Sequence, residues 1–230
     1  MPWPSSPRPG QTGGVFAWTV MPAPGPIGAL TLGATAAGLA LVAFGDHPEA
    51  AAQAAERLGL AAVRSHRRAG DGAPARLWTD GVAAAGEPTQ PPEAELDGAA
   101  PGPRAAEAVL EHAVAQLREY FAGGRRVFDV PLDWSLTRGS QRRVLETLFT
   151  TVGYGATATY GELAARSELG SAHTAARGVG AIMGSNPLPV VVPCHRVMAA
   201  DGLGGFGGGR ATKEWLLAHE GVLTGALDFG

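Results

Sequence analysis

The chain has 230 residues, of which 45% are hydrophobic, and this is enough to bury the core of one large domain or two small ones. Its 18 basic and 21 acidic side chains nearly balance, so it lacks the positive excess of many nucleic-acid-binding proteins. The single cysteine, Cys194, excludes an internal disulfide and a cysteine-rich zinc site. No apolar run approaches the roughly 18 residues of a membrane helix, and the N-terminus lacks an apolar signal core. We therefore expect a cytoplasmic protein without membrane association.

The N-terminal part predicts a small α/β domain over residues 15–134, after a disordered leader at 1–14 that is rich in Pro, Gly and Ser. Short apolar runs separated by Pro and Gly predict an antiparallel meander with strands at 16–20, 27–33 and 39–44. A helix is expected over 47–60, with Asp46 as N-cap and Pro48 at its first position.

Residues 61–103 contain Ala, Gly, Pro and scattered charge without apolar periodicity, and they predict a long flexible insertion. A helix over 104–121 follows, which Gly123 and Gly124 end, and 127–132 is a candidate strand. The face expected to be apolar comprises Ala105, Ala108, Val109, His112, Leu117 and Tyr120.

A second, mainly helical domain is expected over 135–225. Its helices are predicted at 140–152, 160–167, 172–183 and 212–220. Two short helices joined by a few residues that include Gly170 are typical of a helix-turn-helix. The second of these two helices carries small residues, so Arg177 would protrude from a shallow surface. Those small residues include Ala175, Ala176 and Gly180.

The segment 190–197 places Cys194 directly before His195 and Arg196. A thiolate is the reactive form of cysteine, and a neighbouring base or cation helps to populate it at neutral pH. The alternative is that Cys194 is a small buried hydrophobe. Glu220, at the end of the last helix, is a candidate partner for the histidine, and its alternative is a solvated charge at a helix end. Both alternatives stay open on the residues alone.

A glycine-rich loop over 202–210 contains a GxGxxG match, but no second strand follows to complete a dinucleotide-binding unit. Such a loop beside a reactive cysteine can line a pocket because absent side chains leave room for a substrate. A flexible connector is the alternative.

Taken together, these residues resemble one family, the O6-alkylguanine-DNA alkyltransferases, also called methylated-DNA–protein-cysteine methyltransferases. The resemblance is continuous from about 140 to 221, with weaker echoes at 120–124 and 128–132. Its motifs are PCHRV (193–197), NP (186–187), YGELA (160–164), AAR (175–177) and KEWLLAHE (213–220).

This resemblance implies an α/β (α+β) fold. A small ribonuclease-H-like N-terminal domain would precede a mainly helical C-terminal domain with a helix-turn-helix. It implies that Cys194 accepts the alkyl group from O6-alkylguanine, and also from O4-alkylthymine, in one irreversible turnover. His195 would activate the thiol through a water, and Glu220 would orient His195. No metal or other cofactor is implied, and the partner would be double-stranded DNA, bound by a monomer through the minor groove.

The resemblance also assigns the flipped nucleotide its surroundings. Tyr160 would help rotate the nucleotide and protonate the leaving guanine, and Arg177 would fill the base stack that the nucleotide vacates. Ala175, Ala176 and Gly180 would also bind the DNA. The pocket and its hinge would comprise Asn186, Pro193, Val197, Met183, Phe206 and Gly207. The chain departs from the family in its long 61–103 segment, in extra residues between Tyr160 and Arg177, and in lacking the N-terminal cysteines with which some animal members bind zinc.

Three other functions compete with this interpretation. Alkyltransferase-like damage sensors share the helix-turn-helix and the pocket but lack the cysteine. A transcription regulator with an inactive repair domain would need an additional sensor or DNA-binding segment. A thiol hydrolase using Cys194 and His195 would need an oxyanion site. The size of the alkyl group that the pocket accepts is not readable from the sequence.

Overall fold

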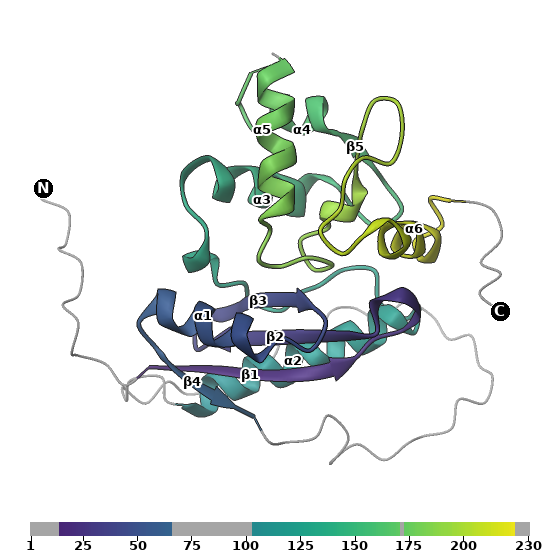
Figure 1. Cartoon of the computed structure of the whole chain (residues 1–230). Helices are drawn as coiled ribbons and strands as arrows, with labels where there is room; N and C mark the ends of the chain where they lie inside the picture. Colours follow the sequence, from purple (N-terminus) through teal and green to yellow (C-terminus); the bar gives the residue numbers. More distant parts are fainter. Residues whose placement is uncertain (1–13, 66–102, 171–172, 224–230) are drawn as a thin grey trace, which may run out of the picture.

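A computed structural model describes residues 14–65, 103–170 and 173–223 (Figure 1). Within them the fold is mixed α/β, with a four-stranded sheet and six α-helices. The strands are β1 (Val15–Pro22), β2 (Ala29–Thr35), β3 (Gly38–Phe44), β4 (Ala61–Arg64), and the short pair β5 (Ala158–Thr159) and β6 (Val197–Met198). The helices are α1 (Pro48–Leu58), α2 (Pro103–Phe121), α3 (Gly139–Thr151), α4 (Tyr160–Arg166), α5 (His173–Gly184) and α6 (Arg210–His219), with 3-10 turns at Gly25–Ile27, Trp134–Leu136 and Cys194–Arg196.

The sheet has the order β3-β2-β1-β4. Strands β1, β2 and β3 form the expected antiparallel meander, and β4 pairs parallel with β1. The prediction that residues 61–103 have no structure is therefore wrong for 61–64, and residues 66–102 lie outside the described part. Strand β4 was not predicted because all four of its side chains are exposed, so its sequence has no alternation of apolar and polar residues.

Helix α1 begins at Pro48 as expected, but its N-cap is His47 and not Asp46. The His47 side chain makes no capping hydrogen bond, so Pro48 and the acidic residue after it define this helix start. The helix ends at Leu58 because Gly59 adopts the left-handed conformation, with φ of 67°, and its N–H returns to the last turn.

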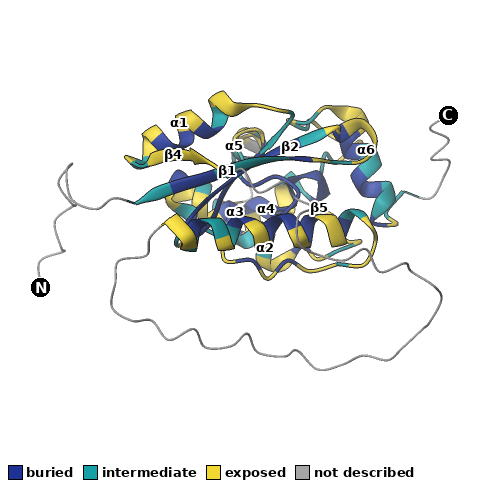
Figure 2. Cartoon of the chain, turned by 90° about the horizontal axis from the view of Figure 1, so that it is seen from below, coloured by how far each residue is buried: buried dark blue, intermediate teal, exposed yellow. Residues whose placement is uncertain are grey.

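The sheet is covered on both faces, by α1 on one and by α2 on the other (Figure 2). The predicted apolar face of α2 is partly wrong, because Ala108 and His112 are exposed. Ala-rich helices offer two possible apolar phases, and packing against β1 and β2 selects the phase that buries the larger side chains. The buried residues are Ala106, Leu110, Ala113, Val114, Gln116, Leu117 and Tyr120.

The candidate strand at 127–132 is not a strand. It makes one isolated bridge, between Leu132 and Leu39 of β3. The Leu39 N–H donates to the Pro131 carbonyl at 2.8 Å, but proline has no N–H with which to continue a ladder. The segment therefore runs beside the sheet and leads the chain into the C-terminal helices.

The predicted C-terminal helices are present, with ends that differ by at most two residues from the expected ones. Thr159 caps α4 through a capping box: its hydroxyl accepts from the N–H of Glu162, and the Glu162 carboxylate accepts from the N–H of Thr159. Helices α4 and α5 pack against each other and against α3. Among the described residues, no helix has both the length and the apolar character needed to cross a membrane.

The C-terminal helices lie beyond the β3 edge of the sheet (Figure 1). One hydrophobic cluster extends from the α2 face of the sheet into these helices, so the two parts share a core. The N–H of Val42, on β3, donates to the carbonyl of Pro187 at 2.7 Å. The edge of the sheet thus holds the loop that leads to Cys194.

Candidate functional site

The loop before Cys194 is held by one side chain. Asn186 donates its Nδ2 to the Val192 carbonyl at 2.9 Å, and its Oδ1 accepts from the N–H of Leu188 at 3.0 Å. Within this loop Val190 takes a left-handed conformation with φ of 73°, which is rare for a β-branched residue and costs free energy. The amide of Asn186 therefore fixes the path of the chain into the 3-10 turn that begins at Cys194.

The Cys194 side chain is almost completely buried, with 4% of the residue exposed. Burial raises the pKa of the thiol to about 11, although the hydrogen bond to Asn186 and the nearby charge of Lys213 act in the opposite direction. The resting thiol is therefore protonated at neutral pH. A group that reacts as thiolate needs a base here.

The neighbouring His195 is such a base. It is fully buried, and burial lowers its pKa, so the ring is neutral at pH 7 although Glu220 favours the charged form. Its Nε2 lies 2.9 Å from Oε1 of Glu220. Its Nδ1 has no hydrogen-bond partner within the described part of the chain. Since Glu220 can only accept, Nε2 carries the hydrogen and Nδ1 keeps a free lone pair that can take a proton.

Glu220 is the centre of the buried charge cluster. Arg196 donates its Nε to Oε2 at 2.8 Å and its Nη2 to Oε1 at 2.9 Å, a bidentate pair. Burial alone would raise the pKa of Glu220, but the hydrogen bonds from His195 and Arg196 outweigh it and lower the pKa to about 2. The residue is only 5% exposed, so the interpretation of Glu220 as a solvated helix-end charge is wrong.

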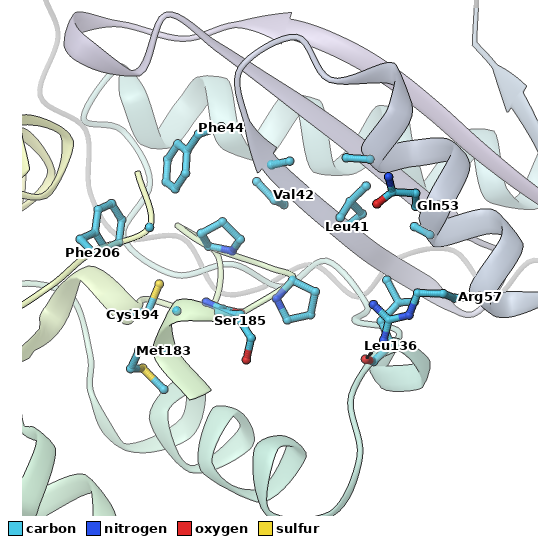
Figure 3. A pocket seen from close by; sticks show the side chains of 18 residues that line it. Leu41, Val42, Phe44, Gln53, Arg57, Leu136, Met183, Ser185, Cys194 and Phe206 are labelled. Carbon is cyan, nitrogen blue, oxygen red and sulfur yellow. Dashed lines mark hydrogen bonds between the residues drawn. The ribbon is translucent and has the colours of Figure 1, made fainter. Parts of the chain in front are cut away.

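Two cavities adjoin this cluster. The first, which we call the thiol cavity, has a volume of about 350 Å³ and lies between β3 with α1 on one side and the Asn186 loop on the other. Figure 3 shows Cys194, Met183 and Phe206 grouped at one end of it and Arg57 with Gln53 at the other. The second, the helix cavity, has a volume of about 590 Å³ and opens beside α5.

The sequence-predicted residues divide between these cavities. The helix cavity is lined by Tyr160, Ala176, Arg177 and Gly180. Asn186 lines the thiol cavity together with Cys194. Met183, Phe206 and Gly207 line both cavities, which therefore share a wall. Ala175, Pro193 and Val197 line neither of the two.

The glycine-rich loop supports Tyr160. The phenol donates to the Gly205 carbonyl at 3.3 Å, and Gly204 packs so close to the ring that a Cβ there would lie 3.0 Å from it. Gly204 also has φ of 72°, which disfavours other residues. Burial raises the pKa of Tyr160, with a smaller contribution from Cys194, so the phenol stays protonated.

Two residues of the buried site, Lys213 and Tyr120, were not predicted from the sequence. Lys213, the only lysine in the chain, is fully buried, and its Nζ donates to the carbonyls of Val197 at 2.6 Å and of Leu203. Burial lowers its pKa to about 8. Tyr120 of α2 donates to Glu220 at 2.7 Å. A lone lysine among many arginines was a usable signal, whereas Tyr120 looked like packing.

The described residues contain no group of three or more His, Cys, Asp or Glu side chains that could hold a metal ion. A buried thiol beside a neutral histidine, itself bound to a buried carboxylate, defines a class of site in which cysteine acts as a nucleophile. The thiol lines the thiol cavity, so it can be reached by a group bound there.

Comparisons with known proteins narrow this class. Residues 139–222 match the family model described as 6-O-methylguanine DNA methyltransferase, DNA binding domain. The methylated-DNA–protein-cysteine methyltransferase of Mus musculus is 52% identical over 86 residues, covering 36% of this chain and 39% of that protein. Its counterpart in Mycolicibacterium paratuberculosis is 51% identical over 111 residues, covering 47% and 63%.

Two crystal structures from Mycobacterium tuberculosis are similar over more of the chain. O6-methylguanine methyltransferase is 30% identical with a TM-score of 0.54, and OGT in complex with DNA is 29% identical with a TM-score of 0.55. Each match covers 90% of this chain and 92% of the other. The chain belongs to the methylated-DNA–protein-cysteine methyltransferase family. The matches to the two curated relatives above span 39% and 63% of their own lengths.

Proposed function

We propose that this protein repairs DNA by transferring the alkyl group of O6-alkylguanine to Cys194 in a single irreversible turnover. The observation that carries the proposal is the buried thiol beside His195 and Glu220 in a chain of this family. In the step, the Cys194 sulfur forms a bond to the alkyl carbon and the bond from that carbon to guanine O6 breaks. The electron pair stays with the guanine, which takes up a proton. The thioether is not hydrolysed, so each molecule acts once.

The proton relay follows from the electrostatics of the site. His195 is neutral and has a free lone pair on Nδ1, so it can take the thiol proton through a bridging water. The imidazolium that results is stabilised by Glu220. Tyr160 holds its proton and lines the helix cavity, so it can protonate the leaving guanine there. General acid catalysis of this kind typically contributes about a hundredfold or more.

The proposal includes the finer architecture. We assign residues 15–134 to a ribonuclease-H-like domain and residues 135–225 to the alkyltransferase domain, with α4 and α5 as its helix-turn-helix. Double-stranded DNA would meet α5 through its minor groove. The exposed Arg177 and the small residues Ala175, Ala176 and Gly180 support this, because they let the helix approach closely while one side chain enters the stack. Flipping the nucleotide out costs a few kcal/mol.

The two cavities suggest where the flipped nucleotide would lie. The base would occupy the helix cavity, and its O6 substituent would point past Met183 and Phe206 toward Cys194 and the thiol cavity. A volume of about 350 Å³ is far more than a methyl group needs and lies in the range of small-molecule sites. We therefore expect transfer of a benzyl group as well as a methyl group. A methyl-only protein would contradict this part of the proposal.

The test is the intact mass of the protein after incubation with a duplex that carries O6-methylguanine. Wild type should gain one methyl group per molecule, mapped by peptide analysis to Cys194, and Cys194→Ser should gain none. If the mass of wild type is unchanged while it still binds the damaged duplex more tightly than an undamaged one, the protein is a damage sensor and the transfer proposal is wrong. Gel filtration and cell fractionation would test action as a monomer in the cytoplasm.

A further inference from the structure

Tyr120 reaches the buried cluster from the N-terminal part of the fold. It belongs to α2, which packs on the sheet, and its Oη donates to Oε1 of Glu220 at 2.7 Å. The side chain is fully buried, so this hydrogen bond has no competition from solvent. The carboxylate that accepts from His195 thus also accepts from a residue 100 positions earlier in the chain.

Both carboxylate oxygens of Glu220 accept hydrogen bonds. Oε2 accepts from Nε of Arg196 and, at 3.4 Å, from the N–H of Gly155. Oε1 accepts from His195, from Nη2 of Arg196 and from Tyr120. These five donors occupy all four lone-pair directions of the carboxylate, so its rotation is restricted. The phenol is the donor that comes from outside the C-terminal helices and their loops.

The phenol is a permanent donor. Burial, followed by the charge of Glu220, raises the pKa of Tyr120 far above the neutral range, so its hydroxyl keeps its proton at any working pH. The titratable and charged groups that face Glu220 are His195, Arg196, Tyr120 and Tyr154. Among these, Arg196 neutralises the carboxylate, whereas Tyr120 directs it without changing the net charge.

We propose that Tyr120 is a positioning residue for the thiol: it holds Glu220 so that His195 keeps its hydrogen on Nε2 and its lone pair on Nδ1. This inference rests on the proposed function and deepens it. The N-terminal part of the fold then completes the proton relay of the C-terminal part. Removing the hydroxyl would let the carboxylate turn, weaken the hold on the imidazole, and make proton uptake from Cys194 less favourable.

The competing explanation is that Tyr120 only packs. Its ring contacts Phe121, Phe128, Tyr154 and His219. The substitution Tyr120→Phe separates the two explanations because it keeps the ring and removes only the hydroxyl. Tyr154→Phe is a matched control: it also removes a phenol hydroxyl from this aromatic cluster, but one that donates to the carbonyl of His219 at 2.9 Å.

The first measurement is independent of DNA. Because Cys194 is the only thiol in the chain, the rate of its alkylation by iodoacetamide as a function of pH reports its ionisation directly. We expect Tyr120→Phe to react about tenfold more slowly at pH 7, at the lower end of the 10–100-fold that orienting partners of histidine contribute in metal sites. The deficit should shrink as the pH rises to about 11, the pKa of the thiol, where the thiolate forms without the histidine. Tyr154→Phe should stay within about twofold of wild type throughout.

The second measurement is methyl transfer from the modified duplex under single-turnover conditions, in wild-type and His195→Gln backgrounds. If Tyr120 acts through His195, Tyr120→Phe slows transfer in the first background and adds nothing in the second. Equal slowing in both backgrounds, or wild-type iodoacetamide kinetics for Tyr120→Phe, would overturn the inference. If no variant, wild type included, transfers a methyl group, the proposed function fails, while the iodoacetamide profile still tests the role of Tyr120.

Discussion

The two parts of the described chain bury different chemistry. The N-terminal part buries mainly aliphatic and aromatic side chains. Among its described residues, the buried carboxylate is Asp133, which accepts from the Thr35 hydroxyl at 2.5 Å, and the buried phenol of Tyr120 donates to Glu220. The C-terminal part instead surrounds Cys194 with ionisable side chains. Those that are buried there are His195, Arg196, Lys213 and Glu220.

This difference separates what stabilises the fold from what reacts. Apolar burial is the dominant favourable term in folding, whereas a buried ion pair contributes little net stability because desolvation offsets the attraction. The C-terminal cluster is therefore explained better by chemistry than by stability. With the exception of Tyr120, which donates to Glu220, substitutions in the sheet part should change the free energy of unfolding alone. Substitutions in the cluster should change the rate of transfer as well.

The largest expected effect is that of Glu220→Gln. The variant should lose about a hundredfold or more in the rate of methyl transfer, because His195 loses its negative partner. It should also lose about 3–5 kcal/mol of unfolding free energy, because Arg196 is left as an uncompensated buried charge. Single-turnover kinetics and urea unfolding measure the two quantities. Temperatures well below the melting transition keep the variant folded for the kinetic assay.

Glu214→Gln is the matched control for this prediction. Glu214 lies on the same helix, α6, and pairs on the surface with Arg210 at 2.8 Å. Such exposed pairs contribute little, so stability should change by less than about 1 kcal/mol and the transfer rate should not change. If Glu220→Gln transfers the methyl group as fast as Glu214→Gln, the claim that the buried cluster of the C-terminal part acts in the reaction is contradicted.

The next largest effect belongs to the sheet part. Leu110→Ala, in the face of α2 that packs on the sheet, should cost about 2–5 kcal/mol because it leaves a cavity. Transfer per folded molecule should stay at the wild-type rate. Val127→Ala is the control, since Val127 is 72% exposed and its truncation should stay within about 0.5 kcal/mol. A slowed transfer in folded Leu110→Ala would show that the apolar core also tunes the site.

The same contrast explains what the sequence could predict. Apolar periodicity and the positions of Gly and Pro residues predicted the meander and helices α3 to α5. These features determine where such elements begin and end from the local sequence. The phase of α2 went wrong because Ala appears on both of its faces and only the sheet decides between them. β4 was missed because exposed side chains on an edge strand carry no pattern.

The site was predicted from a motif and a family resemblance, and not from local periodicity. The motif around Cys194 and its family resemblance predicted the cluster of Cys194, His195 and Glu220, which lie together although Glu220 is 25 residues from His195. Spacing along the chain gave no indication of Tyr120, because its partner lies 100 residues away and an aromatic residue on an apolar helix face is normally core. Lys213 was missed for a related reason: burial of a lysine depends on backbone carbonyls supplied by other loops.

A third prediction concerns acid. The folded pKa of Glu220 is about 2 against an ordinary value of 4.5, so its contribution to stability is fully present above about pH 4.5 and is lost as pH falls toward 2. The loss should amount to about 3 kcal/mol in urea unfolding over that window. His195, whose pKa is also lowered, adds a loss of the same sign that begins below its ordinary value of 6.5. Glu220→Gln should remove the steep part below pH 4.5, and an unchanged pH profile would contradict the assignment.

The smallest effect should come from the cap of α4, which positions Tyr160 at the first residue of that helix. Thr159→Ala removes the hydroxyl that accepts from the N–H of Glu162 and should cost about 1 kcal/mol. Thr150→Ala, whose hydroxyl donates to the carbonyls of Glu146 and Thr147 within α3, should stay within about 0.5 kcal/mol. Because the cap lies next to Tyr160, Thr159→Ala should also slow transfer by a few-fold, which Thr150→Ala should not. The cap lies in the C-terminal part, where substitutions are expected to change the transfer rate. If Thr159→Ala loses stability without any change in the transfer rate, Thr159 behaves like a residue of the sheet part. Only the buried charges of the C-terminal part would then affect the transfer rate.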